Sequence, residues 1–173
     1  MTVDIDKFVA SYPDFPESGI LFRDISPLLK SPEAMSWSKT NLATAIEHWS
    51  PDYIAGIDAR GFLFSALVAD VLNIGSIMVR KIGKLPGQLE SRKYSLEYGI
   101  DGLSIKQDAD LKDARVVLMD DLLATGGTLS CAKELIELQG AQVVGCAVVV
   151  ELLNLKGKDT LNCPIFSLTQ YDD

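Results

Sequence analysis

Apolar residues follow two different spacings along this chain, and the two spacings alternate. Three stretches, residues 32–49, 62–72 and 128–139, carry apolar side chains at the intervals of a half-buried helix. Ser31 is the expected N-cap of the first, and Gly140 is the expected stop after the last. Short, almost continuously apolar stretches predict strands covered on both faces; they are residues 53–57, 76–79, 115–119 and 142–150.

A strand, a helix and a second strand in succession form a βαβ unit, and several such units follow one another here. We therefore predict an α/β fold, with a mostly parallel twisted sheet flanked by helices. Residues 94–100 instead alternate apolar and polar side chains, which predicts an antiparallel strand in a small flap. The first residues suggest a helix that ends before residues 12–16, where two prolines favour an extended turn.

Length and composition indicate one ordinary globular domain, which we expect to span residues 1–173. Hydrophobic residues make up 47% of the chain and charged residues 23%, and no repeat or linker divides it. No apolar run approaches the ~18 residues that a membrane helix needs. The three cysteines, Cys131, Cys146 and Cys163, show no metal-site spacing and look like small core residues. We expect a cytoplasmic protein without a membrane partner or a secretory signal.

Charge is unevenly distributed along the chain. The formal net charge of −8 argues against nucleic acid as a partner, because binding phosphate backbones needs a basic face. Residues 80–93 (RKIGKLPGQLESRK) nevertheless hold five bases and one acid, which is +4 and leaves −12 for the rest. This segment is either a solvated loop or a mobile, glycine-containing loop that closes over a small anion.

Residues 116–128 (VVLMDDLLATGGT) carry the clearest chemistry. A buried strand leads into Asp120 and Asp121, and a loop of small residues then opens a helix. Backbone N–H groups at such a helix start can surround a phosphate, while the two acids would repel it and so must face sugar hydroxyls or magnesium. This combination favours a phosphorylated sugar as the ligand.

This segment has other interpretations. A P-loop requires a lysine after the glycines, and a dinucleotide fingerprint requires GxGxxG; both are absent. The acids could also merely cap a turn that the glycines make tight. A phosphatase built on Asp-x-Asp is disfavoured because Asp120 and Asp121 are adjacent and Leu122 follows them.

The segment 116–128 resembles the signature for phosphoribosyl pyrophosphate (PRPP) in type I phosphoribosyltransferases, and its LLATGGT form is similar to that of members acting on adenine. Further similar segments are YPDFPESGILFRDISPLL (12–29), IAGIDARGFLF (54–64), VRKIGKLPG (79–87), YSLEYG (94–99) and VELLNLKG (150–157). The resemblance covers nearly the whole chain. It departs from the family pattern at Glu17-Ser18 and at Ile82, each of which stands where a proline is more usual, and Ile82 could alter the stiffness of its loop.

The resemblance implies the type I phosphoribosyltransferase fold, with residues of about 1–30 in a base-binding hood and about 80–100 in a flexible loop and flap. It implies a purine-salvage enzyme that transfers phosphoribose from PRPP to adenine, giving AMP and pyrophosphate. The transition state would resemble an oxocarbenium ion, Mg²⁺ would be the cofactor, and the enzyme would be a homodimer.

The resemblance also implies roles for particular residues. The 5′-phosphate would lie on Ala124, Thr125, Gly126, Gly127 and Thr128, and the pyrophosphate on Arg60, Lys81 and Lys84. Asp120 and Asp121 would approach the ribose hydroxyls or a magnesium-bound water, with no direct metal ligand assigned. Glu97 would exchange a proton with adenine. Leu21, Phe22, Arg23 and Leu152 would bind the base, with the backbone of Leu21 and Arg23 reading its edge.

Taken one at a time, these residues have ordinary interpretations. Arg60 could form a surface ion pair, Glu97 could be one polar residue on a wet strand, and Phe22 and Leu152 could belong to the core. Two other functions therefore stay open, namely a transferase for hypoxanthine or xanthine, and a regulatory domain that binds PRPP without catalysis. The retained YSLEYG strand and basic loop favour an enzyme, because a sensor could dispense with Glu97.

Overall fold

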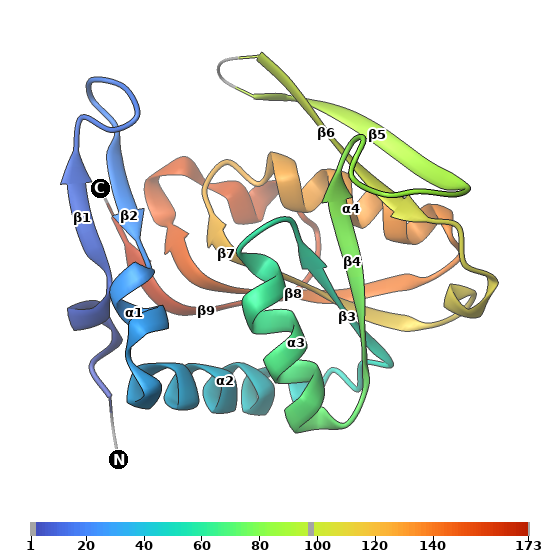
Figure 1. The fold of residues 1–173 in the computed structure, drawn as a ribbon, viewed down its shortest axis with the longest axis horizontal. Coiled ribbons are helices and arrows are strands. Elements are labelled where there is room, and N and C mark those ends of the chain that lie inside the picture. The colour runs from blue at the N-terminus through green and yellow to red at the C-terminus, as the bar shows by residue number, and fades with distance from the viewer. Residues whose placement is uncertain (1–2, 97–98, 173) are drawn as a thin grey trace.

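The computed structural model describes residues 3–96 and 99–172 and is built around one large sheet. Its strand order is β5-β6-β4-β3-β7-β8-β9 (Figure 1). The strands are β3 (Tyr53–Ile57), β4 (Gly75–Lys81), β5 (Leu89–Leu96), β6 (Gly99–Lys106), β7 (Arg115–Leu123), β8 (Gln142–Leu152) and β9 (Ile165–Tyr171). The pairs among β3, β4, β7, β8 and β9 are parallel, whereas β6 runs antiparallel to β4 and β5. The predicted α/β fold with a mostly parallel sheet is confirmed.

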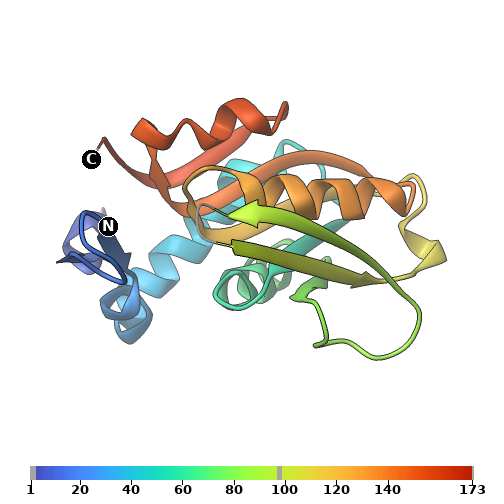
Figure 2. The same ribbon diagram turned by 90° about the horizontal axis from the view of Figure 1, so that it is seen from above.

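Helices cover both faces of this sheet. The α-helices are α1 (Ser26–Lys30), α2 (Pro32–Glu47), α3 (Gly61–Leu72) and α4 (Gly127–Leu138). Short 3-10 helices are η1 (Ile5–Phe8), η2 (Ala109–Leu111), η3 (Leu153–Leu155) and η4 (Gly157–Thr160). One hydrophobic core joins α2 and α3 to the sheet, and a second joins α4 to the opposite face (Figures 1 and 2). None of the described helices is long and apolar enough to span a membrane.

The helices begin and end where the local chemistry predicts. The Ser31 hydroxyl accepts a hydrogen bond from the Ala34 amide at 3.2 Å, which caps α2, and Pro32 is its first residue. Leu42 and Ile46 are fully buried on its inner side. The predicted helix 128–139 lies within one residue of α4, and the predicted strand 53–57 matches β3.

Two small substructures stand at the edge where β3, β4 and β7 end. The hood is the antiparallel pair β1 (Ala10–Pro13) and β2 (Leu21–Asp24), which forms its own sheet. The flap is the β5–β6 hairpin. Figures 1 and 2 show the hood and the flap at opposite ends of this edge, so that the strand ends lie between them.

Three predicted elements differ from the structure. The opening helix is wrong, since only η1 is helical and the next residues form β1 through pairing with β2. Residues 94–100 are not one strand, because β5 ends at Leu96, β6 begins at Gly99, and these two residues pair with each other. The strand predicted to stop at Met119 continues to Leu123, because β8 extends beside it and Leu123 pairs with Glu151.

Candidate active site

A tight loop joins β7 to α4 at the edge between hood and flap. Gly126 has φ +85°, a left-handed conformation that favours glycine, and α4 begins at the next residue. The first amides of α4 therefore point toward the loop, as they do where helices bind phosphate. The sequence predicted this strand, loop and helix arrangement.

The loop is supported from behind by a segment far along the chain. A Cβ added to Gly126 would lie 2.5 Å from the Gly157 carbonyl oxygen, and one added to Gly157 would lie 2.8 Å from the Gly126 nitrogen. Thr160 closes the same contact, because its hydroxyl donates to the Gly157 carbonyl at 2.8 Å. The two backbones are in direct contact, so the loop cannot move toward Gly157.

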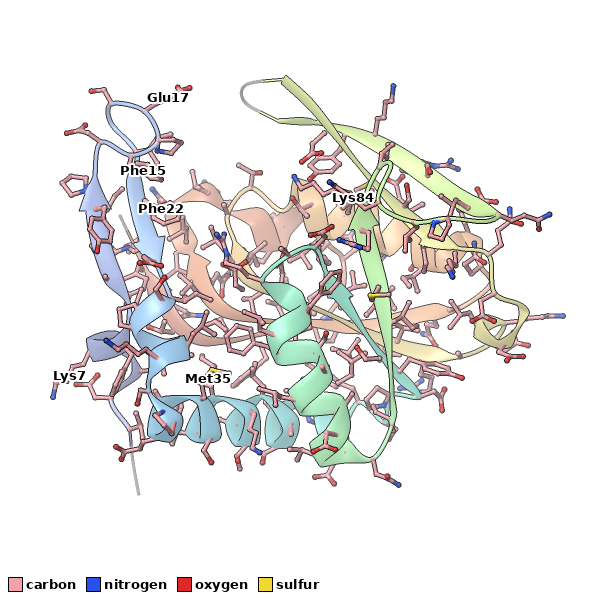
Figure 3. All side chains as sticks on the ribbon, viewed as in Figure 1. Lys7, Phe15, Glu17, Phe22, Met35 and Lys84 are labelled. Carbon is pink, nitrogen blue, oxygen red and sulfur yellow. The ribbon has the colours of Figure 1, made fainter. Side chains whose placement is uncertain are left out.

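A cavity of about 400 Å³ opens above the loop. The lining residues come from the turn after β3, the end of β4, β5, the end of β7, the loop after it and the start of α4; they are Asp58, Ala59, Arg60, Lys81, Tyr94 and residues 120–129. The structure therefore brings together the predicted phosphate loop, both predicted acids and two of the three predicted pyrophosphate cations. Lys84 does not line this cavity and lies on the loop that follows β4 (Figure 3).

The two acids differ in their surroundings. The Asp121 carboxylate accepts a hydrogen bond from Nε of Arg60 at 2.5 Å, while the Arg60 side chain remains about half exposed, at 48%. Burial raises the pKa of Asp120 well above its ordinary value, and the charge of Asp121 raises it further. Arg60 thus stands in an ion pair, as its ordinary interpretation expected, but the pair lies inside the cavity.

The flap reaches the cavity through a polar network. Thr128, on the first turn of α4, donates a hydrogen bond to the Tyr94 hydroxyl at 3.1 Å. Lys81 forms an ion pair with Asp101, in which its ammonium donates a hydrogen bond to the Asp101 carboxylate. This hydrogen bond raises the pKa of Lys81. Lys81 is therefore a firmly charged cation at the cavity wall.

A second set of polar contacts fixes the end of β4 and the start of the loop that follows it. Nε of Arg80 donates to the Asp58 carboxylate at 3.1 Å, and the same carboxylate accepts from the Lys81 amide at 3.3 Å. A further Arg80 nitrogen donates to the Lys84 carbonyl at 3.4 Å. These contacts hold the beginning of the basic loop next to the cavity.

The residues predicted to bind the base lie apart from this cavity. Leu21, Phe22 and Arg23 are on β2, where Phe15 and Phe22 meet edge to face with centroids 5.2 Å apart (Figure 3). The Arg23 guanidinium lies 3.8 Å from the centroid of the Tyr171 ring, and Tyr171 is the register partner of Leu152. The hood and the end of β8 are therefore connected through Tyr171. Glu97, the predicted proton carrier, lies outside the described residues.

Some residues of the site were not predicted from the sequence. Asp58 and Tyr94 stood inside segments that were recognised, IDARG and YSLEYG, so a signal for them existed. Asp101 had none, because it faces Tyr94 only through the register of the flap hairpin. The support from Gly157 and Thr160 depends on a contact between segments about thirty residues apart.

A helix-start loop, two adjacent acids and two cations around one cavity are the features expected of a phosphoribosyltransferase, and comparison with known proteins agrees with this class. A family model described as "Phosphoribosyl transferase domain" matches residues 25–164. An adenine phosphoribosyltransferase of Gluconobacter oxydans is 48% identical over 171 residues, which cover 99% of this chain and 96% of that protein.

Solved structures agree as well. The adenine phosphoribosyltransferase of Thermoanaerobacter pseudethanolicus has a TM-score of 0.93 and 44% identity, covering 97% of this chain and 98% of that one. The enzyme of Saccharomyces cerevisiae, in complex with adenine and an imino-altritol bisphosphate, has a TM-score of 0.88 and 38% identity, with coverage of 96% and 97%. This chain belongs to the phosphoribosyltransferase family, and within it to the adenine phosphoribosyltransferases.

Proposed function

We propose that this protein transfers the 5-phosphoribosyl group of PRPP to adenine, giving AMP and pyrophosphate in purine salvage. One observation carries the assignment to PRPP: a single cavity joins a phosphate-sized loop at a helix start, two adjacent carboxylates and the cations Arg60 and Lys81. PRPP has a phosphate, a hydroxylated sugar and a pyrophosphate, and each part meets a suitable partner there. The named activity of the relatives supplies adenine as the acceptor.

The loop of residues 124–128 would hold the 5′-phosphate. Its backbone amides and the first turn of α4 offer donors and a favourable dipole. Thr125 and Thr128 add hydroxyl groups. Because Gly157 backs the loop without a gap, the cradle is rigid before the ligand arrives, which lowers the entropic cost of binding.

Arg60, Lys81 and Lys84 would bind the pyrophosphate. The ion pair with Asp121 fixes the Arg60 guanidinium at one edge and leaves its outer part exposed to the cavity, where it can clamp two oxygens. Lys81 is held by Asp101 and must exchange this carboxylate for the ligand. Lys84 would join from the basic loop when that loop closes.

Departure of pyrophosphate would leave positive charge on the ribose ring, as in an oxocarbenium ion, with inversion at the anomeric carbon. The chain's own residues then serve two ends: the cations stabilise the negative charge of the leaving group, and Asp120 and Asp121 position the ribose hydroxyls. Glu97 would exchange a proton with a ring nitrogen of adenine as the base attacks.

Magnesium fits the donors on this wall of the cavity. Asp120 and Asp121 offer hard oxygen atoms, and the described residues contain no group of three or more metal-ligating side chains. The protein would therefore hold Mg²⁺ through the phosphates of PRPP, with a metal-bound water in contact with Asp120 or Asp121 and no side chain assigned as a direct ligand, which is typical of this ion. When bound, the ion would neutralise charge on the pyrophosphate.

Adenine would lie between Phe22 of the hood and Leu152 at the end of β8. Backbone groups of Leu21 and Arg23 would read its edge, because adenine offers a donor next to an acceptor and hypoxanthine reverses both. A wrong base then leaves buried polar groups unpaired, which can be worth ~10⁴-fold discrimination. A cytoplasmic homodimer completes the proposal, and a purely monomeric sedimentation profile would contradict the dimer.

The deciding experiment incubates the protein with PRPP, Mg²⁺ and each purine in turn and measures nucleotide and pyrophosphate. We expect AMP from adenine, little product from hypoxanthine or xanthine, and loss of turnover when EDTA removes the metal. Preference for hypoxanthine or xanthine would indicate another purine transferase. Stabilisation by PRPP of about 2.7 kcal/mol at 100-fold excess over Kd, without any product, would instead indicate a sensor.

The assignment of the two acids has its own test. Replacing both, Asp120→Asn with Asp121→Asn, should abolish turnover while the circular dichroism spectrum stays that of the folded protein. Near-wild-type turnover in this double variant would refute their role.

A further inference from the structure

Two of the three cysteines lie together in a place that the proposed reaction does not use. Cys146 is in the middle of β8, and Cys163 comes two residues before β9. Their sulfur atoms are 3.6 Å apart, and both are free thiols. The Cys146 amide donates to the Pro164 carbonyl at 2.9 Å, so the backbones are held side by side at this point.

The two thiols differ in exposure and in acidity. Cys146 is fully buried, whereas Cys163 is partly exposed. The hydrogen bond with Cys146 lowers the pKa of Cys163 more than partial burial raises it, and the nearby ammonium of Lys133 lowers it further against the opposing charge of Glu137. The same contact, together with burial, raises the pKa of Cys146. Such a pair has an accessible attacking thiol and a protected resolving thiol.

We propose that Cys146 and Cys163 form a redox-active dithiol that is oxidised to an intramolecular disulfide by low-molecular-weight disulfides such as glutathione disulfide. The Cys163 thiolate attacks one sulfur of the oxidant, forms a mixed disulfide and releases one thiolate. Cys146 then gives up its proton and attacks the Cys163 sulfur, which releases the second thiol. Two protein thiols lose two electrons and two protons, and one disulfide becomes two thiols. Only Cys163 has to meet the oxidant.

The third cysteine provides an internal comparison. Cys131 is buried on α4, and its sulfur donates to the Arg92 carbonyl at 3.6 Å rather than to another thiol. Burial is the main cause that raises the pKa of Cys131. It should therefore stay reduced under conditions that oxidise the pair.

The pair is also connected to the phosphate loop. Residues 146 and 163 are the two ends of a segment that contains Gly157 and Thr160, the support behind Gly126. A disulfide bond is about 2.05 Å long, so oxidation must bring the sulfurs closer by roughly 1.5 Å. Because Gly157 touches the loop backbone without a gap, a shift of this segment is transmitted to the cradle. This consequence rests on the proposed function, and we expect oxidation to raise KM for PRPP several-fold.

Trypsin separates the three cysteines, which makes the chemistry easy to read. No lysine or arginine lies in 134–155 or 159–173, so trypsin releases the peptides 134–156 and 159–173, and Cys131 falls in the peptide 116–133. The protein is incubated with increasing ratios of oxidised to reduced glutathione, the remaining thiols are blocked, and the non-reduced digest is analysed by mass spectrometry. We expect peptides 134–156 and 159–173 to be joined, with the intact protein two mass units lighter, and dithiothreitol to reverse both changes.

Three variants complete the test. Cys131→Ala should be oxidised like the wild type. Cys163→Ala should form no linked peptides and keep its KM for PRPP in oxidant. Cys146→Ala should accumulate a stable glutathione adduct on Cys163, because the resolving thiol is gone.

Linked peptides do not depend on activity, so their absence and a failure of the proposed function can be told apart. The proposal is overturned if the wild type gains only glutathione or stays reduced at every ratio. A disulfide that forms but leaves KM for PRPP unchanged overturns the connection to the phosphate loop.

Discussion

At the scale of single residues, the neighbours Asp120 and Asp121 show how position decides chemistry. Both lie near the end of β7, but successive side chains of a strand point to opposite faces. Asp121 meets the guanidinium of Arg60, and Asp120 loses hydration without an equivalent partner. One acid therefore lies in an ion pair, and burial makes the other resist ionisation.

This difference predicts a pH-dependent effect of Asp120→Asn on stability. A carboxyl whose pKa is raised by folding binds more protons in the folded state, so its contribution is lost as pH rises through the folded-state pKa. Above that pH, the buried charge of Asp120 destabilises the folded state, and asparagine removes this destabilisation. In thermal unfolding of the ligand-free protein, the variant should melt above the wild type at pH 8, and the gap should close toward pH 4.

The matched control is Asp121→Asn, which breaks the ion pair with Arg60 and should lower the melting temperature at pH 8. A melting temperature of Asp120→Asn below that of the wild type at pH 8 would contradict the unfavourable burial of the Asp120 charge.

Glu97→Gln tests the proposed proton carrier. The amide cannot exchange a proton with adenine, so kcat should fall by about 10²- to 10³-fold, consistent with loss of general acid–base catalysis. Steady-state kinetics with adenine and PRPP measure it. Glu90→Gln is the control, because Glu90 lies on β5 and accepts a hydrogen bond from the Gln107 side-chain amide outside the cavity, so this variant should leave kcat unchanged. An equal kcat for wild type and Glu97→Gln would remove Glu97 from the mechanism.

At the scale of elements, the phosphate loop depends on a glycine for two reasons. Gly126 has a left-handed backbone, and its missing side chain admits Gly157 and Thr160. The first reason is local and visible in the sequence. The second comes from the packing of η4 against the loop.

Gly126→Ala separates these reasons when it is compared with Gly140→Ala. Both positions have φ near +80°, but a Cβ at Gly140 meets nothing closer than 3.5 Å. Both variants should lose about 1 kcal/mol of stability from backbone strain, and Gly126→Ala should lose more because its Cβ would lie 2.5 Å from the Gly157 carbonyl oxygen. Only Gly126→Ala should also raise KM for PRPP, by about tenfold if one phosphate hydrogen bond is lost. Equal kinetics in the two variants would show that the contact with Gly157 does not matter for binding.

The cap of α2 predicts a purely structural effect. Ser31→Ala removes the acceptor for the Ala34 amide and should lower the free energy of unfolding by about 1 kcal/mol, measured by urea denaturation. Thr40→Ala, on the exposed side of the same helix, should change it by less than about 0.5 kcal/mol. Neither variant should change KM, and a kinetic effect of Ser31→Ala would contradict a local role.

At the scale of the whole molecule, the hood is attached to the body by side chains. Its two strands form a separate sheet, so no backbone ladder joins it to β9. The Arg23 guanidinium stacks on Tyr171, and the Tyr171 hydroxyl donates to Asp6 at 3.0 Å, while Thr169 donates to the same carboxylate. Burial, and then Asp6, raises the pKa of Tyr171, so the hydroxyl keeps its proton at neutral pH. The two ends of the chain and the hood thus meet at one ring.

Tyr171→Ala should therefore loosen the hood, which we propose binds the base, without affecting the loop of residues 124–128. We expect KM for adenine to rise several-fold while KM for PRPP stays within about twofold, since small local changes away from a site couple weakly to it. Tyr171→Phe keeps the ring under Arg23 and should retain most of the affinity. A parallel rise of both KM values would show that Tyr171 supports the fold generally and does not position the hood.

Much of the fold could be predicted from the sequence because its signals are local. Buried strands 53–57 and 142–150, the cap at Ser31 and the glycine loop after β7 each depend on neighbouring residues. The prediction of an opening helix was wrong because β1 is fixed by its pairing with β2, and local propensity takes no account of such a partner. The prediction of the flap was wrong in detail because the alternating sequence pattern continues without a break from the end of β5 into the start of β6.

The sequence by itself determined the α/β class, the strand, loop and helix around residues 124–128, and the resemblance that identifies the family, since all of these depend on adjacent residues. Only the tertiary structure decided that Asp121 holds Arg60, that Asp101 holds Lys81, that Gly157 supports Gly126, and that Cys146 meets Cys163. Each of these contacts joins segments that strand order and register bring together, and a pattern confined to one segment carries no information about the other.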